Sequence, residues 1–437
     1  MFPVLRSRAV VFSTLAVFAL SCASTHLPPI SSAGSQFEPF KDEVRLWDEA
    51  RAEEQKLLAE TPLYEDPLLE DYLQGVVDGL TPPGMAANRQ LRYRVRVVED
   101  PSLNAFAYPH GSMYVHTGLL ARMENEDQLA TVLGHEMTHV ENRHSLRYRR
   151  SARNKQIGFS IAALAAAVVL AGEEGDAWGE GEWARAARVG VLGDILLTLG
   201  LQLAFLASVN GYGRGLEEEA DVGGFNKMLA AGYDLRESPK VYQALLEDHG
   251  DPGKVEAFFF GSHPKLANRI TNAEERVAAL PAASLSAPPT APAAPSDEFS
   301  RRIRSVVRDD ARLNIEAGRL KLAADELARA KAALPEDPEV HFLIARLKLA
   351  QADASSDAAK RTRLLEGARA ALEKSRRLGL DRPELDRELG LMAYRAEDWA
   401  AACEHFARYV DKAGGAPDVS TIRGYLLELQ RDGHCRG

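Results

Sequence analysis

The sequence predicts a mainly α-helical (α+β) fold with one small β-sheet, arranged in two domains. Apolar residues recur at helical spacing over most of the 437-residue chain. One stretch near residue 95 instead alternates charged and apolar residues, as a half-buried strand does. Residues 281–299 are rich in Pro, Ala and Ser, a composition that cannot bury a core, so we place the domain boundary there.

The composition excludes some classes of protein. Lys plus Arg number 53 and Asp plus Glu 63, which gives a formal net charge of -10. Without a basic excess we expect no nucleic-acid partner. The three cysteines are too few for a disulfide-built scaffold, and no two of them form a CxxC pair. Cys403 and Cys435 could pair in an oxidising compartment if Cys22 is lipidated.

The N-terminal residues are typical of an export signal. Arg6 and Arg8 precede a mostly apolar run over residues 9–20, so residues 1–21 are predicted to be a signal peptide that is removed. The next residue, Cys22, resembles the lipidated cysteine of a bacterial lipoprotein box. Ordinary secretory cleavage fits the same small residues and remains the alternative.

We expect the mature chain in the periplasm, anchored to the outer membrane by a lipid on Cys22. Ala23 follows that cysteine, as in lipoproteins sorted to the outer membrane. The polar residues 22–37 are predicted to form a flexible tether. After it, residues 38–280 form the first predicted domain and residues 300–437 the second.

The first domain is predicted to begin with helices and to continue into a small sheet. Two helices are expected between Glu38 and Leu80, separated by the prolines within 62–67. The remaining expected elements are strands at 93–97 and 113–116 and a helix over 126–145. Two apolar runs follow, at 157–172 and 189–209.

The two apolar runs are predicted to be amphipathic helices beside the active-site cleft. The second is long enough to span a bilayer, but Asp194 and Gln202 interrupt it. The first is short and Ala-rich. Contact with a membrane surface, or a membrane span, is the alternative.

The second domain shows a repeat. Pro383 and Pro417 lie 34 residues apart, each before an expected helix start, and 34 residues is the tetratricopeptide period. A solenoid of paired helices would offer a groove for a protein partner. A plain helical bundle is the alternative.

A metal-binding motif lies in the expected helix over 126–145. His135, Glu136 and His139 form HExxH, in which the two imidazoles at i and i+4 face one side of the helix and can share one Zn2+. Glu136 lies beside them, where it can take a proton from a metal-bound water. A catalytic zinc needs a third protein ligand.

An acidic stretch supplies the candidate for that ligand. Glu217 and Asp221 are again at i and i+4, so Glu217 can ligate the metal while Asp221 accepts a hydrogen bond from the outer nitrogen of a ligand histidine. The alternative is a solvated acidic run at a helix N-terminus. His144 falls off the metal-facing stripe, and we expect a structural role for it.

These motifs together resemble the HtpX-like and CAAX-prenyl-protease-like zinc metallopeptidase family, in its BepA-type exported branch with C-terminal tetratricopeptide repeats. The resemblance is carried by HExxH, by Asn104-Ala105-Phe106-Ala107 upstream, by Arg214-x-x-Glu217-x-x-Ala220-Asp221 and by Ser262-His263-Pro264. It implies a zincin-like domain with one zinc ion per chain. It also implies a substrate-binding hairpin at Asn104, Ala105, Phe106 and Ala107, and a catalytic or inhibitory His263 near the metal.

We therefore expect a zinc endopeptidase of the bacterial cell envelope, in which a zinc-bound water activated by Glu136 attacks the peptide bond. Its expected substrates are misfolded or stalled envelope proteins, and its repeat domain is expected to bind a protein partner. The alternative is an assembly factor or chaperone that acts through the repeat domain and has a latent metal site.

Overall fold

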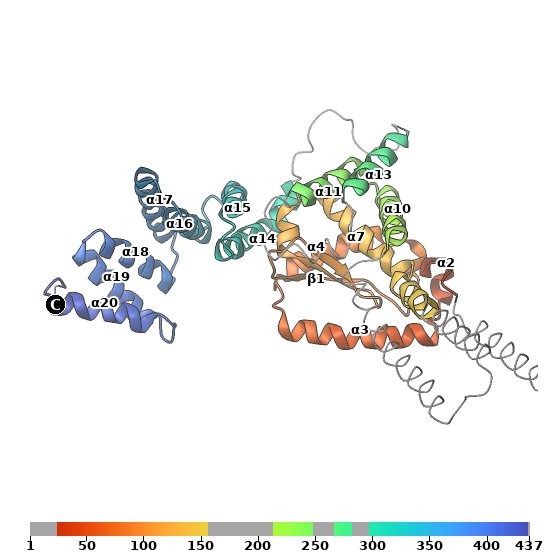
Figure 1. Cartoon of the computed structure of the whole chain (residues 1–437), viewed down its shortest axis with the longest axis horizontal. Helices are drawn as coiled ribbons and strands as arrows, with labels where there is room; N and C mark the ends of the chain where they lie inside the picture. The colour runs from red at the N-terminus through yellow and green to blue at the C-terminus, as the bar shows by residue number, and fades with distance from the viewer. Residues whose placement is uncertain (1–23, 156–212, 248–265, 282–296, 436–437) are drawn as a thin grey trace, which may run out of the picture. The chain divides into compact units, whose positions relative to one another are not determined.

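The computed structural model describes residues 24–155, 213–247, 266–281 and 297–435 (Figure 1). Internal contacts divide the chain into two compact units, Met1–Ser296 and Asp297–Gly437, and each is described here by itself. The predicted signal peptide, Cys22, both apolar runs and His263 lie outside the described residues. Within the described ranges, no helix is both long and apolar enough to cross a lipid bilayer.

The first two long helices of the first unit are α3 (Lys41–Glu60) and α4 (Pro67–Leu80), on either side of the proline-containing segment where the sequence predicts a break. Helix α4 starts where it does because the Asp66 carboxylate accepts hydrogen bonds from two free backbone N–H groups of the first turn, while Pro67 occupies a position that needs no N–H. Its apolar residues recur every three or four positions, so one face is buried.

A three-stranded sheet follows, with strands β1 (Arg94–Val98), β2 (Ala105–Ala107) and β3 (Ser112–His116) in the order β1-β3-β2. Strand β3 is parallel to β1 and antiparallel to β2. The fold is thus mainly helical with one small sheet, as the sequence predicts. Because β2 lies at an edge of the sheet, one side of its backbone has no neighbouring strand among the residues that the structure describes.

Helices cover both faces of this sheet, as Figure 1 shows for α3 and α7 (Glu126–Glu141). On the α3 face, Ala50 and Leu57 pack with the aromatic rings of Phe106 and Tyr114. On the other face, α7 packs against β2, and the Tyr93 hydroxyl donates a hydrogen bond to the carbonyl of Met137 at 3.1 Å. The sheet therefore fixes the position of the helix that carries HExxH.

The segment expected to be a flexible tether is packed against the first unit over residues 24–37. It contains α2 (Ile30–Ala33) and the 3-10 helix η1 (Gly34–Gln36), and it buries Leu27, Ile30 and Phe37. Leu27 lies in an apolar cluster with residues of α3 and of the segment after α7. The apolar residues within this polar stretch provide the burial that a free tether lacks.

Arginines that follow α7 connect it to this N-terminal region. Arg143 forms a buried, two-pronged hydrogen-bonded pair with Glu43 at 2.6 and 2.9 Å. Arg150 pairs with Asp42 through two bonds of 2.8 Å and also donates to the backbone carbonyl of Ser24 at 3.0 Å. Such paired geometry combines charge with fixed orientation, so the chain next to Ser24 is held on the domain.

Three further helices complete the described part of the first unit: α10 (Arg214–Ala231), α11 (Ser238–Glu247) and α13 (Leu266–Ala279). Helix α10 packs along α7 through glycines on both helices. The buried ion pair of Lys227 with Glu141, at 2.6 Å, joins the same two helices. The short elements are α5 (Pro83–Ala86), α6 (Thr117–Arg122) and the 3-10 helix η2 (Leu235–Glu237).

The second unit is helical throughout its described residues, 297–435. Neighbouring helices pack in pairs, α14 with α15, α16 with α17 and α18 with α19, and α20 packs on α19. Their bounds are α14 (Asp297–Glu316), α15 (Leu320–Ala333), α16 (Pro338–Asp353), α17 (Ala358–Arg377), α18 (Pro383–Arg395), α19 (Trp399–Lys412) and α20 (Val419–Arg431). Helix α14 begins inside the range 281–299 that the sequence marks as linker.

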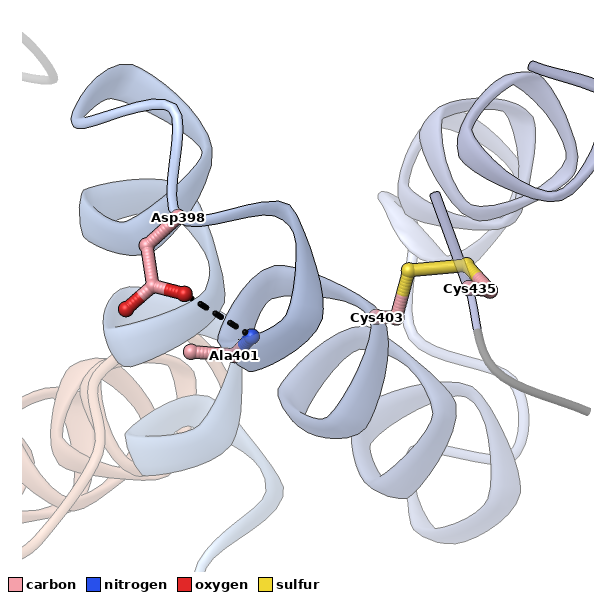
Figure 2. Close-up of a disulfide and its surroundings, with 4 residues drawn as sticks. All are labelled: Asp398, Ala401, Cys403 and Cys435. Atoms are coloured by element: carbon pink, nitrogen blue, oxygen red, sulfur yellow. Dashed lines mark hydrogen bonds between the residues drawn. A yellow bond between two sulfur atoms is a disulfide. The ribbon is translucent and has the colours of Figure 1, made fainter. Parts of the chain in front are cut away.

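A disulfide closes the C-terminal end of the second unit. Cys403 of α19 is bonded to Cys435, which follows α20, and Figure 2 shows this bond beside the start of α19. The Asp398 carboxylate caps that helix by accepting a hydrogen bond from the Ala401 N–H at 3.3 Å. The possible pairing considered from the sequence is therefore present in the structure.

Candidate metal centre

Helix α7 carries the HExxH motif and is buried from Gln128 to its last residue, Glu141. Its first turn is stabilised by the Asn125 side chain, which accepts a hydrogen bond from the Gln128 N–H. His135, Glu136 and His139 are 3%, 4% and 2% exposed. Polar side chains this deeply buried require partners, and for the two histidines these come from α10 and from the residues after α7.

The two histidines and Glu217 of α10 bring three donor atoms together. The Nε2 atoms of His135 and His139 lie 3.0 Å apart, and the Glu217 carboxylate oxygens lie 3.5 and 3.6 Å from them. Ligand atoms about 2.1 Å from a tetrahedral zinc lie roughly 3.4 Å from one another. The spacing and the chemistry of these donors therefore fit a zinc ion, and all three residues are buried.

The other ring nitrogen of His135 faces Asp221. Asp221 Oδ1 lies 2.8 Å from His135 Nδ1 and accepts further hydrogen bonds from Arg269, at 2.6 Å, and from the Tyr242 hydroxyl, at 3.0 Å. Arg269 also lies over the Tyr242 ring, 4.2 Å from its centroid. Asp221 is thus fixed by α11 and α13 as well as by its own helix.

These contacts determine the charge of Asp221. Burial opposes ionisation of this carboxyl, but the Arg269 guanidinium and the hydrogen bond with His135 outweigh burial and hold the pKa of Asp221 well below its ordinary value. An ionised carboxylate at Nδ1 orients the imidazole so that Nε2 faces the metal position.

The other ring nitrogen of His139 faces His144. The two Nδ1 atoms lie 2.9 Å apart, and the rings meet edge to face with centroids 4.8 Å apart. His144 is fully buried, and its Nε2 lies 3.5 Å from the Glu219 carboxylate. Burial lowers the pKa of His144 from its ordinary value, so the neutral imidazole is favoured.

Glu219 is held in turn by residues that follow the HExxH motif. Arg147 donates to both of its carboxylate oxygens at 2.7 and 2.8 Å, and Asn142 donates to one of them at 2.9 Å. Hydrogen bonding from His144, followed by that from Arg147, lowers the pKa of Glu219 to about 2. Glu219 is therefore a carboxylate at neutral pH.

The segment expected to bind substrate lies at the sheet edge. The Asn104 carbonyl accepts a hydrogen bond from the His116 N–H of β3, and Phe106 pairs with Tyr114. The alternation of the strand therefore turns the N–H and C=O groups of Ala105 and Ala107 toward the edge. The Asn104 side chain is 1% exposed, and neither of its amide atoms has a hydrogen-bond partner within the described residues.

Sequence reasoning missed three residues of this site, Tyr242, Arg269 and Glu219, and for His144 it predicted only a structural role. The i,i+4 spacing of Arg269 from Ala273 places it on the buried face of α13, but a sequence does not show which carboxylate it meets. His144 falls off the helical stripe because α7 ends at Glu141 and a turn at residues 142–143 redirects the chain. Without knowledge of this turn, the sequence does not show that His144 lies beside His139.

Comparison with known proteins adds the family. The model of Peptidase family M48 matches residues 67–277, which include α4, the sheet, α7 and α10. Residues 67–277 form a Peptidase family M48 domain. Members of this family depend on zinc, and the three-ligand group on α7 and α10 of this M48 domain has the donors that zinc prefers.

Relatives of the M48 domain occur in bacteria and in mitochondria. The chain is 27% identical over 232 residues to the beta-barrel assembly-enhancing protease of Yersinia pestis and 26% identical over 223 residues to a protein of Vibrio cholerae named as a putative protease of that kind. It is 32% identical over 185 residues to the mitochondrial metalloendopeptidase OMA1 of Schizosaccharomyces pombe. These matches cover 51%, 50% and 42% of this chain and 41%, 41% and 47% of the relatives, so the chain spans less than half the length of each.

Proposed function

We propose that this protein is a zinc-dependent endopeptidase of the bacterial cell envelope. The observation that carries the proposal is the convergence of His135, His139 and Glu217 from two helices, with Glu136 in the turn of α7 between the two histidines. Three protein ligands leave the fourth position of a tetrahedral zinc open, as catalysis requires. Membership of the matched residues in Peptidase family M48 supports the same activity.

The residues divide the chemistry among them. Bound zinc would supply a Lewis acid for the scissile carbonyl and lower the pKa of a water at the site. Glu136 accepts the proton that this water loses on attack and delivers it to the leaving amine. Asp221 keeps its hydrogen bond to His135 throughout, so the ligand does not rotate while charge develops.

The edge strand β2 is the proposed binding surface for the substrate backbone. The outward N–H and C=O groups of Ala105 and Ala107 can pair with an extended peptide, as in strand addition. The buried Asn104 amide has unused donors and acceptors at the start of this strand, and an unsatisfied buried amide costs on the order of 1 to 3 kcal/mol. Phe106 holds the strand in place by stacking on the Tyr114 ring.

For His263, which lies outside the described residues, the family resemblance implies a role at the metal site. We propose that it stabilises the developing oxyanion or, in a resting state, occupies the open zinc position. A variant distinguishes the two roles: His263→Ala lowers turnover in the first case and raises it in the second.

The proposed setting is the periplasmic face of the outer membrane, with a lipid on Cys22 and zinc as the one metal per chain. The names of the bacterial relatives, beta-barrel assembly-enhancing proteases, favour substrates that are misfolded or stalled envelope proteins. For the second unit we propose a tetratricopeptide-like solenoid that binds a protein partner, because its helices pack in consecutive pairs.

The test combines metal content with cleavage of casein by the purified protein. We expect one zinc per chain, full zinc but no cleavage in Glu136→Gln, and loss of both in Glu217→Gln. The matched control is Glu218→Gln on the same helix, an exposed neighbour that should retain zinc and activity. Stoichiometric zinc without cleavage in any form would instead support an assembly factor acting through the second unit. Absence of zinc would refute the site.

A further inference from the structure

The Nδ1 atom of His139, which faces away from the metal position, contacts a second histidine instead of a carboxylate. His144 Nδ1 lies 2.9 Å from His139 Nδ1, and no part of the His144 side chain reaches solvent. His135, in contrast, meets the carboxylate of Asp221 directly. The two metal-facing histidines therefore have different supports.

The protonation pattern of the histidine pair follows from the metal position. The Nε2 atoms of His135 and His139 converge, so His139 would use Nε2 to bind zinc. A neutral imidazole that ligates through Nε2 carries its proton on Nδ1 and donates it there. The Nδ1 atom of His144 must then accept this hydrogen bond, which leaves its proton on Nε2, the atom 3.5 Å from Glu219.

Glu219 completes a chain that starts at the metal ligand. Its carboxylate is held by two bonds from Arg147 and one from Asn142, so it presents a fixed negative charge to His144. These hydrogen bonds run in one direction: His139 donates to His144, and His144 donates toward Glu219, whose carboxylate can only accept.

We infer that His144, backed by Glu219, is the positioning residue for His139, fixing its tautomer and the orientation of its ring toward zinc. The inference rests on the proposed zinc site. It gives each of three acidic residues of α10 a separate role. Glu217 faces the metal, Asp221 supports His135 and Glu219 supports His139 through His144. Helix α10 thus controls both histidines of HExxH.

Two variants at position 144 separate positioning from packing. Leu fills the site without a hydrogen-bond acceptor, whereas the Asn side-chain oxygen stands as many bonds from Cα as Nδ1 does and can accept. We expect the zinc dissociation constant, measured by competition with a chelator, to rise about 10- to 100-fold in His144→Leu. We expect His144→Asn to recover most of the affinity. The visible absorption of the Co2+-substituted protein should change in His144→Leu and return in His144→Asn.

The matched control is His341→Leu, which removes a histidine of similar burial from the second unit, where its ring bonds the Pro335 carbonyl at 2.8 Å. It should lower the free energy of unfolding without changing zinc affinity or the Co2+ spectrum. If His144→Leu behaves like this control, with wild-type zinc affinity and spectrum, the positioning role is wrong.

A second variant covers the case in which position 144 does not tolerate substitution. The Glu219 side chain is 38% exposed, so Glu219→Ala should fold, and we expect its zinc affinity to fall several-fold with an altered Co2+ spectrum. Unchanged values would overturn the inference. The outcome is separable from the proposed function, because zinc content and casein cleavage of the unaltered protein are measured first and test that function alone.

Discussion

Gly224 of α10 lies against the backbone of His135 so closely that a Cβ at position 224 would stand 2.9 Å from the His135 nitrogen. On the other helix, a Cβ on Gly134 would come within 3.2 Å of the Gly224 Cα. The two helices therefore meet backbone to backbone at the motif. This close approach lets carboxylates of α10 reach both histidines of α7.

A methyl group at this contact should separate the helices. We expect Gly224→Ala to lower the free energy of unfolding by about 1 to 3 kcal/mol and to weaken zinc binding, because the clash is with backbone that cannot move aside. Urea unfolding and chelator competition measure the two effects. The control is Gly75→Ala in α4, where a Cβ meets nothing within 4 Å, and there we expect no loss of stability. Equal behaviour of the two variants would contradict the explanation.

Removing the hydrogen-bond partner of His135 should lower the affinity of the site for zinc. In Asp221→Asn the shape is kept but the negative charge is lost, so we expect zinc to bind about 10- to 100-fold more weakly. Arg269→Leu should act in the same direction by releasing Asp221. Arg276→Leu on the same helix is the comparison, since Arg276 contacts the exposed Glu218 instead. Isothermal titration with zinc gives the affinities, and an unchanged value for Asp221→Asn would refute the role of the carboxylate.

The disulfide between Cys403 and Cys435 should stabilise the second unit. It closes a loop with a sequence separation of 32 residues, for which chain entropy predicts about 4 kcal/mol. Reduction should therefore lower the unfolding midpoint of this unit in urea and add two hydrogen masses to the chain. In Cys403→Ser, reductant should change neither. A midpoint that is insensitive to reduction in the unaltered protein would show that the bond contributes nothing measurable.

Acid should weaken the contact between α3 and the sheet at Glu54. Burial opposes ionisation of Glu54, but hydrogen bonds from His110, at 2.9 Å, and Tyr114, at 2.7 Å, outweigh it and lower the pKa of Glu54 to about 2. Because the folded-state pKa lies below the unfolded value near 4.5, this stabilisation is present above that pH and is lost as the pH falls toward 2.

In Glu54→Gln the unfolding free energy should therefore fall less steeply between pH 4.5 and 2, and at neutral pH the variant should be less stable by on the order of 2 kcal/mol. The exposed Glu60 on the same helix provides the control, Glu60→Gln, whose profile should follow that of the unaltered protein. Parallel profiles for all three proteins would exclude a special role for Glu54.

The helices and the sheet could be predicted from the sequence because each depends on a pattern among neighbouring residues. The 3.6-residue period of α4 and the alternation around Val95 are readable within a few positions. The side-by-side placement of His135 and His139 follows from helix geometry alone. The tether was misjudged because composition averages over residues 22–37 and hides Ile30 and Phe37, whose burial depends on partners far along the chain.

The surroundings of the metal ligands could not be read in this way. Asp221 meets Arg269 across 48 residues, and Glu219 meets Arg147 across 72. Neither pairing has a local pattern, and each depends on the packing of α10 against its neighbours. His144 shows the same limit at short range, because only the turn after Glu141 brings it back to His139.

The hydrogen bond from Arg150 to the Ser24 carbonyl limits how far the proposed enzyme can lie from a lipid on Cys22. An extended chain covers at most about 3.6 Å per residue, so the two residues from a lipid on Cys22 to Ser24 allow roughly 7 Å of reach. With the proposed lipid on Cys22, a domain tied this closely would stay near the membrane surface, and distance from that surface would then determine which substrates it reaches. A protein that stalls while inserting there would be within range, whereas one that has already left would escape.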